Sequence, residues 1–254
     1  MGGKRTLAKR LTSILDDVAC TTYAEPFVGM GGVFFRRTRR PKVEVINDLS
    51  GDVANLFRML QRHCNALIET VRWQITSRTE FDRLLAADLS TLTDLERAAR
   101  FLYLQRLAYG GRVTGRTFGV TPEMPARFDV RKVVPLLEVA HERLSGVVVE
   151  RLPYVDFLER YDRPGTLFYL DPPYHGSERV YGQEYGAADH ERLADVLARL
   201  RGRFLLTINA TEHTRRLFAH FQLEEAAVSY GLQGQGRRFQ AKELIVSGPK
   251  TWRP

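Results

Sequence analysis

The sequence predicts an α/β fold in which a parallel sheet carries an inserted all-helical segment. Short apolar runs typical of buried strands alternate with segments of helical periodicity in the outer parts of the chain, whereas residues 52–109 show helical patterns alone. Polar residues suited to chemistry follow directly after several of the expected strands. This is the edge at which open α/β sheets bind their ligands.

Composition points to a polyanionic partner. The 254 residues are 44% hydrophobic, enough for a sizeable core, and the formal net charge is +8 at pH 7. Arginine supplies most of the excess, and its planar guanidinium matches phosphate oxygens. Nucleic acid is therefore the first expected partner, with simple solubility as the alternative.

The sequence also speaks against a membrane protein, a secreted disulfide-bonded protein and a metal site. No apolar run approaches the roughly 18 residues of a membrane span, and no signal peptide opens the chain. Cys20 and Cys64 are too few for a disulfide framework, and the histidines and cysteines lack metal-ligand spacing. We expect a cytoplasmic protein that contacts no membrane and holds no metal.

The first expected helix spans residues 4–18, with leucines and an isoleucine at helical spacing. Gly2 and Gly3 precede it and let a ligand approach the backbone, which would place Lys4 near an anionic group. A strand from Thr22 then runs into a glycine-rich turn and the start of an apolar helix.

Gly29, Gly31 and Gly32 lie in this turn, where a ligand can rest against backbone without Cβ clashes. Their spacing departs from the Gly-x-Gly-x-x-Gly fingerprint of dinucleotide sites, and so favours a ligand without a pyrophosphate. The next strand, residues 43–46, ends at Asn47-Asp48. Asp48 is suited to accept both hydroxyls of a ribose, with a helix N-cap as the alternative.

A loop or hairpin rich in glycine, arginine and threonine follows the helical stretch, over residues 108–120. Arginine reads guanine edges, and glycine allows close approach to a nucleic-acid backbone. The alternative is a solvated loop. A helix over residues 130–145 then ends at Gly146. A strand at residues 147–149 leads to Pro153, Tyr154, Asp156 and Phe157, where the base of a cofactor could pack. For Asp156 an N-cap is at least as good an alternative.

The fourth expected strand, residues 166–170, ends in Asp171-Pro172-Pro173-Tyr174. Neither proline can donate to a strand ladder, so Asp171 is presented at the strand end. Its carboxylate and the Pro172 carbonyl are two acceptors that suit a planar NH2 group, and the Tyr174 ring suits stacking on a base. The alternative is a proline-rich turn.

The rest of the chain predicts a polar loop at residues 175–182, helices at 190–200 and 214–220, and strands at 204–208, 222–230 and 243–248. Between the last two strands lies a basic, glycine-rich segment that suits a sugar-phosphate backbone. A disordered loop is the alternative reading of that segment.

Taken in order, these motifs resemble the Dam-type N6-adenine DNA methyltransferases of the D12 class, which use S-adenosylmethionine. The motifs that match are Gly2-Gly3-Lys4, Glu25 to Gly32, Asn47-Asp48, the helical insertion and Asp171 to Tyr174. The resemblance implies a Rossmann-like methyltransferase sheet from residues 1–52 and 128–254, with a target-recognition domain at 53–127.

The resemblance also assigns residues to roles. Catalysis is implied for Asp171, Pro172, Pro173 and Tyr174. Cofactor binding is implied for Lys4, Glu25, Pro26, Phe27, Gly29, Met30, Gly31, Gly32, Asp48, Asp156, Phe157 and Asp171. We interpret the DNA-binding residues as Tyr109, Arg112, Arg116, Phe118, Arg179, Arg237 and Arg238.

The implied reaction transfers a methyl group from S-adenosylmethionine to N6 of an adenine flipped out of double-stranded DNA. Tyr109-Gly110-Gly111-Arg112 replaces the Tyr-Asn-Gly-Leu pattern of members that methylate GATC, so the recognition sequence stays open. The oligomeric state, monomer or homodimer, stays open as well. The biological role is open too: the protein could be a bacterial orphan regulator, a phage anti-restriction enzyme or half of a restriction pair. A methyltransferase acting on RNA or on a protein glutamine, and a DNA-binding module without catalysis, are the alternatives.

Overall fold

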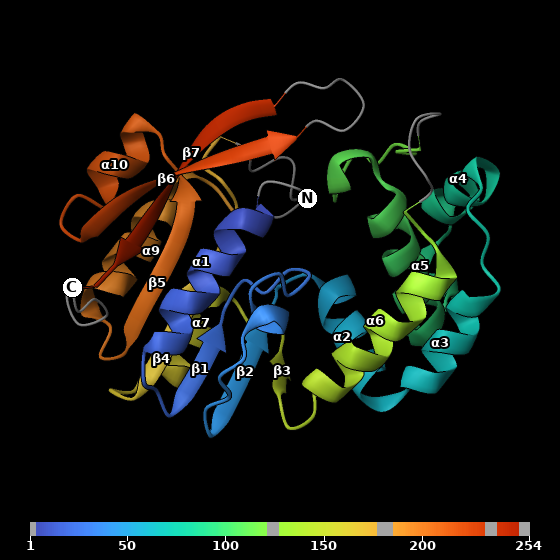
Figure 1. Ribbon diagram of the computed structural model, residues 1–254, viewed down its shortest axis with the longest axis horizontal. Coiled ribbons are helices and arrows are strands. Elements are labelled where there is room, and N and C mark those ends of the chain that lie inside the picture. The colour runs from blue at the N-terminus through green and yellow to red at the C-terminus, as the bar shows by residue number, and fades with distance from the viewer. Residues whose placement is uncertain (1–3, 121–126, 177–184, 232–237, 249–254) are drawn as a thin grey trace. The chain divides into compact units, whose positions relative to one another are not determined.

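The computed structural model describes residues 4–120, 127–176, 185–231 and 238–248, which form two compact units. The sheet unit contains the described residues up to Leu49 and from Gly146 onward, and the helical unit runs from Ser50 to Ser145. Each unit has its own core, and each is described by itself below (Figure 1).

The sheet unit is built on seven strands in the order β3-β2-β1-β4-β5-β7-β6. The strands are β1 (Thr22–Glu25), β2 (Val43–Asn47), β3 (Val148–Glu150), β4 (Thr166–Leu170), β5 (Arg203–Asn209), β6 (Gln222–Gly231) and β7 (Arg238–Ser247). Strands β1 to β5 are parallel, and β7 runs antiparallel to both β5 and β6. The order reverses between β1 and β4, which makes their carboxyl ends the switch point where such sheets bind ligands. The predicted Rossmann-like sheet is confirmed.

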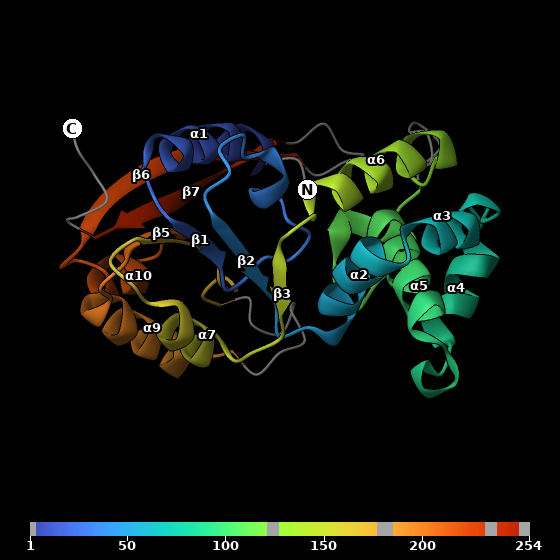
Figure 2. The ribbon, with the colours of Figure 1, turned by 90° about the horizontal axis from the view of Figure 1, so that it is seen from below.

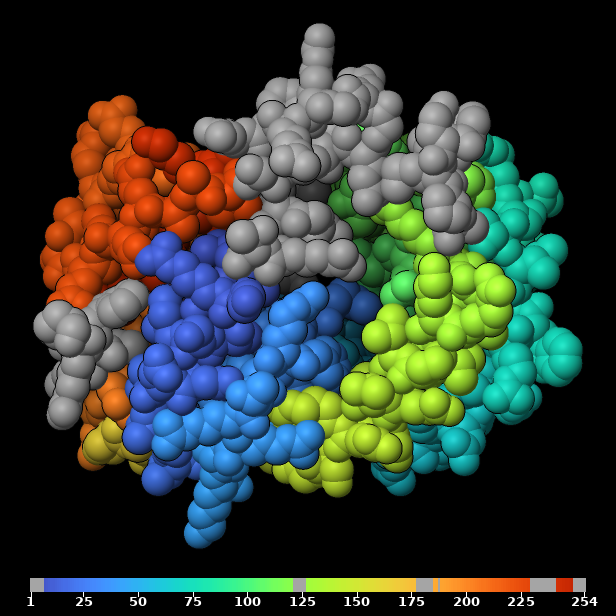
Figure 3. All heavy atoms as spheres, in the orientation of Figure 1, coloured from blue at the N-terminus to red at the C-terminus, as the bar shows by residue number. Residues whose placement is uncertain are grey.

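Helices cover both faces of this sheet. They are α1 (Lys4–Asp17), α7 (Tyr154–Tyr161), α9 (Ala187–Arg199) and α10 (Glu212–Leu217). Figure 2 shows α1 on one face and the other three on the opposite face. In Figure 3, α1 and other N-terminal residues, coloured blue, lie on the visible surface of this unit beside C-terminal residues, coloured orange to red. All five residues of β4 are buried, as expected for a central strand covered on both sides.

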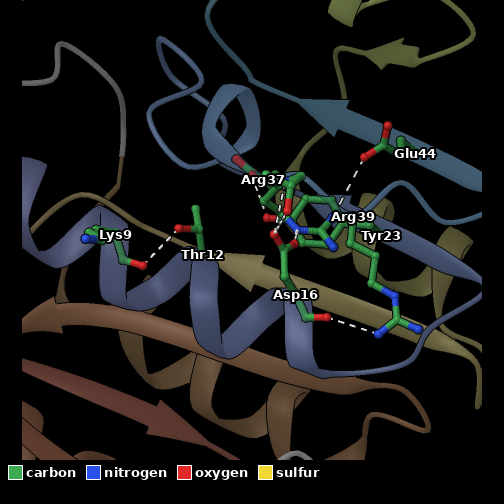
Figure 4. Close-up of polar contacts among 9 residues, drawn as sticks. Lys9, Thr12, Asp16, Tyr23, Arg37, Arg39 and Glu44 are labelled. Carbon is green, nitrogen blue, oxygen red and sulfur yellow. Dashed lines mark hydrogen bonds and ion pairs between the residues drawn. The ribbon is translucent and has the colours of Figure 1, made fainter.

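The chain after the glycine turn differs from the prediction. The expected apolar helix is only a single 3-10 turn, η1 (Phe34–Arg36). Arg37 leaves it with an extended backbone, and its fully buried guanidinium donates to Asp16 of α1 at 2.9 Å and lies 3.7 Å from the centre of the Tyr23 ring (Figure 4). The buried contacts of the Arg37 side chain with Asp16 and Tyr23 fix the direction of the chain at this point. A helix that continued through Arg37 would take the chain in another direction.

The helical unit confirms that the stretch after Ser50 is helical, in separate helices. These are α2 (Gly51–Arg62), α3 (Cys64–Arg72), α4 (Arg78–Ala86), the 3-10 turn η2 (Leu89–Thr91), α5 (Asp94–Leu107) and α6 (Val130–Arg143). Thr93 caps α5 in a capping box with Glu96, and the buried residues of α5 form the centre of the unit.

The last helix of this unit corrects the predicted boundary. We expected residues 128–145 to belong with the sheet, but α6 packs on α2 and α3. His141 Nδ1 lies 2.7 Å from the Leu60 carbonyl oxygen, and Gln61 Nε2 donates to the Leu144 carbonyl at 3.1 Å. The boundary therefore falls after Ser145, where Gly146 takes a φ of +77°.

Candidate active site

The turn after β1 leaves room beside its backbone. Gly29 and Gly31 have φ values of +51° and +68°, which favour glycine. A Cβ at Gly31 would lie 2.4 Å from the Phe35 ring, whereas Cβ atoms at Gly29 and Gly32 would meet nothing within 4 Å. The turn is thus rigid on one side and open on the other, which suits a ligand resting against the main chain.

Asp48 is tied to this turn. Its Oδ2 accepts a hydrogen bond from the Gly29 N–H at 2.9 Å, which brings the end of β2 beside the turn after β1. The alternative of a helix N-cap is wrong, because α2 begins at Gly51 with Ser50 as its N-cap residue. The structure therefore brings together two of the predicted cofactor elements at neighbouring strand ends.

Asn47, which the sequence marks only as part of the Asn47-Asp48 motif, has a supporting role. It is 1% exposed, and its Nδ2 donates to the carbonyls of Pro26 at 2.9 Å and Leu152 at 3.0 Å. Its Oδ1 accepts from the Leu152 N–H at 2.8 Å. A single buried amide therefore joins the carboxyl ends of β1, β2 and β3 and satisfies backbone groups that would otherwise be buried without partners.

An aromatic cluster flanks the same edge of the sheet. The Phe27 ring lies 5.4 Å from Tyr154 and 5.9 Å from Tyr185, measured between ring centres. Burial raises the pKa of Tyr154 to about 12, so this hydroxyl is protonated at neutral pH. Tyr154 is one of the residues past β3 where the sequence places the base of a cofactor, whereas Tyr185 carries no sequence signal of a site.

Two predicted cofactor residues differ in position from the expectation. Phe157 is fully buried in the core of the sheet unit against Tyr161, so it cannot contact a ligand, and its assignment is wrong. The apolar stripe of α7 is the sequence feature that indicates this burial of Phe157. Asp156 lies in the first turn of α7, whose N-cap residue is Pro153, so it is not the N-cap.

The remaining predicted cofactor residues surround the turn or lie beneath it. Glu25 is buried, and its Oε1 accepts a hydrogen bond from the Tyr23 hydroxyl at 2.6 Å. Pro26 is buried too, whereas Met30 is 36% exposed. Lys4 begins α1, and only its backbone lies within the described part of the chain.

The Asp171 motif follows β4 without a break. The Thr207 hydroxyl of β5 donates to Asp171 Oδ1 at 3.2 Å. Because that proton is used, the buried Tyr169 hydroxyl, 3.0 Å from Thr207 Oγ1, must be the donor to Thr207. Burial, with the charge of Asp171, raises the pKa of Tyr169 well above its usual range and keeps this donor protonated. The Asp171 carboxylate is thus held by a chain of two hydroxyls.

The end of the motif is held from the same side of the sheet. The Tyr174 hydroxyl donates to Oε1 of Glu243 at 2.5 Å. Asn209 accepts from the His175 N–H at 3.0 Å and donates to the His175 carbonyl at 2.9 Å. Asn209 and Glu243 face each other across β5 and β7. Thr207, Asn209 and Glu243 were not predicted as site residues, because they follow the motif by many residues and carry no motif of their own.

The predicted DNA-binding loop of the helical unit is closed by a bridge between Ala108 and Phe118 around the 3-10 turn η3 (Tyr109–Gly111). Arg116 turns inward: it donates to Gln105 Oε1 at 3.2 Å, and burial lowers its pKa. The Phe118 ring packs 5.5 Å from Phe81.

These contacts divide the predicted DNA-binding residues. Arg112 is exposed, and Tyr109 is half-buried. Arg179 and Arg237 lie outside the described residues, and Arg238 is described by its backbone alone, at the start of β7. Within the described ranges, no group of three or more histidine, cysteine or acidic side chains is placed to hold a metal ion, and no helix is long and apolar enough to cross a membrane.

The sheet order, the antiparallel β7 and the glycine turn followed by an acidic residue define a Rossmann-like α/β fold. The chain belongs to the D12 class N6 adenine-specific DNA methyltransferase family, whose model matches residues 1–231. It is an adenine-specific DNA methyltransferase that uses S-adenosylmethionine. The predicted family, the predicted cofactor and the predicted methylation of adenine in DNA are confirmed.

Several known proteins are similar to this chain. It is 26% identical to the type II methyltransferase M1.LlaDCHI of Lactococcus lactis subsp. cremoris, over 97% of this chain and 92% of that protein. It is 22% identical to the type II methyltransferase M.CviBI of Paramecium bursaria Chlorella virus NC1A, over 85% and 84%. A SAM-dependent methyltransferase structure from Agrobacterium tumefaciens aligns with a TM-score of 0.45 at 10% identity, over 97% of this chain and 62% of that one.

Proposed function

We propose that the carboxyl edge of β1, β2 and β4 forms the active site, with Asp171 as the group that engages the target adenine. The observation that carries this proposal is the position of Asp171 at the end of a fully buried strand, oriented by Thr207 and followed by an anchored Tyr174. A carboxylate fixed in this way is prepared for a planar amine without further reorganisation.

The residues around the glycine turn fit S-adenosylmethionine. Open space at Gly29 and Gly32 admits the donor against the backbone, and Asp48 beside the turn offers carboxylate oxygen to ribose hydroxyls. When bound, the cofactor supplies a methyl group on positively charged sulfur. Met30 and the Phe27 cluster provide apolar surface near the same turn.

Asp171 and the Pro172 carbonyl accept hydrogen bonds from the two N6 hydrogens of an adenine rotated out of duplex DNA, at a cost of a few kcal/mol. These acceptors draw electron density toward nitrogen and aim its lone pair. The Tyr174 ring stacks on the base and fixes its plane. Positioning of this kind contributes much of the rate of a direct transfer.

The helical unit recognises the target sequence in this proposal, with exposed Arg112 as its clearest candidate for a DNA contact. Two relatives are named type II methyltransferases, which favours a restriction–modification role. Action on double-stranded DNA, as a monomer or homodimer in the cytoplasm, stays a prediction.

The decisive experiment compares Asp171→Ala with wild type, using a labelled methyl group and unmethylated duplex DNA. We expect transfer to fall by about 10³-fold or more, since the main acceptor is lost, while DNA binding by gel shift stays measurable. Asp195→Ala, an exposed acid on α9, is the matched control. Full activity of Asp171→Ala would refute the assignment. Parallel assays with tRNA, rRNA and protein test the substrate class.

A further inference from the structure

Glu243 is an acidic residue buried beneath the end of the catalytic motif. It is 1% exposed, lies in β7 opposite Asn209 of β5, and receives the Tyr174 hydroxyl on Oε1 at 2.5 Å. Burying a carboxyl group is unfavourable unless hydrogen bonds compensate it. No sequence motif marks Glu243, and the reaction proposed above does not require it to touch either substrate.

Tyr174 is held at both ends by this arrangement. Asn209 fixes the main chain at His175 through two hydrogen bonds, and Glu243 fixes the far end of the ring. Only two side-chain torsions separate these ends. The phenol oxygen lies on the axis about which the ring turns, so fixing it sets the direction of that axis. Because a phenolic O–H lies in the plane of its ring, an acceptor held in the sheet also favours one ring plane before the base binds.

We propose that Glu243 is a positioning residue that sets the plane of the Tyr174 ring against which the target adenine stacks. The inference rests on the proposed function of Tyr174. A ring free to rotate would still bind the base, because stacking tolerates tilt, but it would misdirect N6. Small displacements of reacting groups cost up to about 10²-fold in rate.

The test uses the full chain carrying Glu243→Leu, which removes the acceptor for the Tyr174 hydroxyl, Tyr174→Phe or both, with Glu225→Leu as a matched control. Glu225 lies on the neighbouring strand β6 in exposed ion pairs with Arg215 and Lys242, so its charge loss should change little. Methylation-sensitive sequencing first identifies the target site. Duplexes containing that site then give kcat and KM, and 2-aminopurine at the target position reports stacking by its fluorescence.

For Glu243→Leu we expect kcat to fall about 10- to 100-fold, with KM for DNA and affinity for S-adenosylmethionine within about 3-fold of wild type. Quenching of the 2-aminopurine should weaken. Tyr174→Phe keeps the ring and loses the hydroxyl, so it should lower kcat similarly. Adding Glu243→Leu to Tyr174→Phe should change kcat by less than about 2-fold, because both remove the same hydrogen bond.

The proposal is overturned if Glu243→Leu keeps the wild-type kcat, or if the two effects multiply in the double variant. If Glu243→Leu does not fold, as judged by circular dichroism, Tyr174→Phe decides: full activity without the hydroxyl overturns the proposal, and a lowered kcat at unchanged KM supports it. These failures leave wild-type methylation of DNA intact, whereas an inactive wild type would refute the proposed function itself.

Discussion

Two loops meet at the carboxyl edge of the sheet, and they are held in different ways. The glycine turn after β1 depends on its own backbone conformation and on the adjacent end of β2, through Asp48 and Asn47. The motif after β4 is held by side chains of β5 and β7, namely Thr207, Asn209 and Glu243. The first loop must leave space, whereas the second must present groups in fixed directions.

This contrast shows how each loop should fail. In the turn, any added atom meets either a wall, as at Gly31, or the space meant for a ligand, as at Gly29 and Gly32. In the motif after β4, function can be lost without adding any atom. Removing a hydrogen-bond partner on β5 or β7 is enough, because a catalytic group is then free to move. Substitutions in the turn should therefore change stability and cofactor binding, and those behind the motif should change mainly the rate.

The largest stability effect is expected for Gly31→Ala. Its φ of +68° is unfavourable for alanine, and the new Cβ would lie 2.4 Å from the Phe35 ring. Together these should lower the free energy of unfolding by about 2–4 kcal/mol and abolish measurable cofactor binding. Urea denaturation with Gly32→Ala as the stability control tests this, because a Cβ there meets no atom within 4 Å. Equal stability of the two variants would contradict a rigid turn.

An intermediate effect is expected at Asp48. Asp48→Asn keeps an oxygen for the Gly29 N–H but replaces the second acceptor by a donor, so affinity for S-adenosylmethionine should fall about 10- to 100-fold with little change in stability. Asp48→Ala should lose the same affinity and about 1 kcal/mol of stability in addition. Calorimetric titration and urea denaturation separate the two roles. Wild-type affinity in Asp48→Asn would show that Asp48 only holds the turn.

The same contrast explains what the sequence could predict. Glycines, prolines and apolar runs act within a few residues, so the strands, the turn and Asp171 with its flanking prolines were predictable. Glu243 reaches Tyr174 only because β7 inserts beside β5, a pairing that no local pattern specifies. Placing α6 on the helical unit depended in the same way on tertiary packing. The position of Phe157 just past a strand predicts contact with a ligand, and this prediction is wrong. The apolar stripe of α7, to which Phe157 belongs, is packed into the core instead.

The smallest functional effect, and the one that best isolates the motif after β4, is expected for Thr207→Val. Valine fills the same volume but removes the hydroxyl that joins Tyr169 to Asp171. The buried Tyr169 hydroxyl then loses this acceptor, at about 1–3 kcal/mol of unfolding free energy, and Asp171 loses the donor that orients it. We expect kcat to fall about 10-fold while affinity for S-adenosylmethionine stays unchanged.

Thr207→Ser is the matched control, since it keeps the hydroxyl and loses only a methyl group. It should retain most of the wild-type kcat and pay a smaller stability penalty. If serine and valine lower kcat equally, packing at Thr207 rather than its hydrogen bond orients Asp171. If valine instead weakens cofactor binding as strongly as Asp48→Ala does, the two loops are not independently held, and the distinction between them fails.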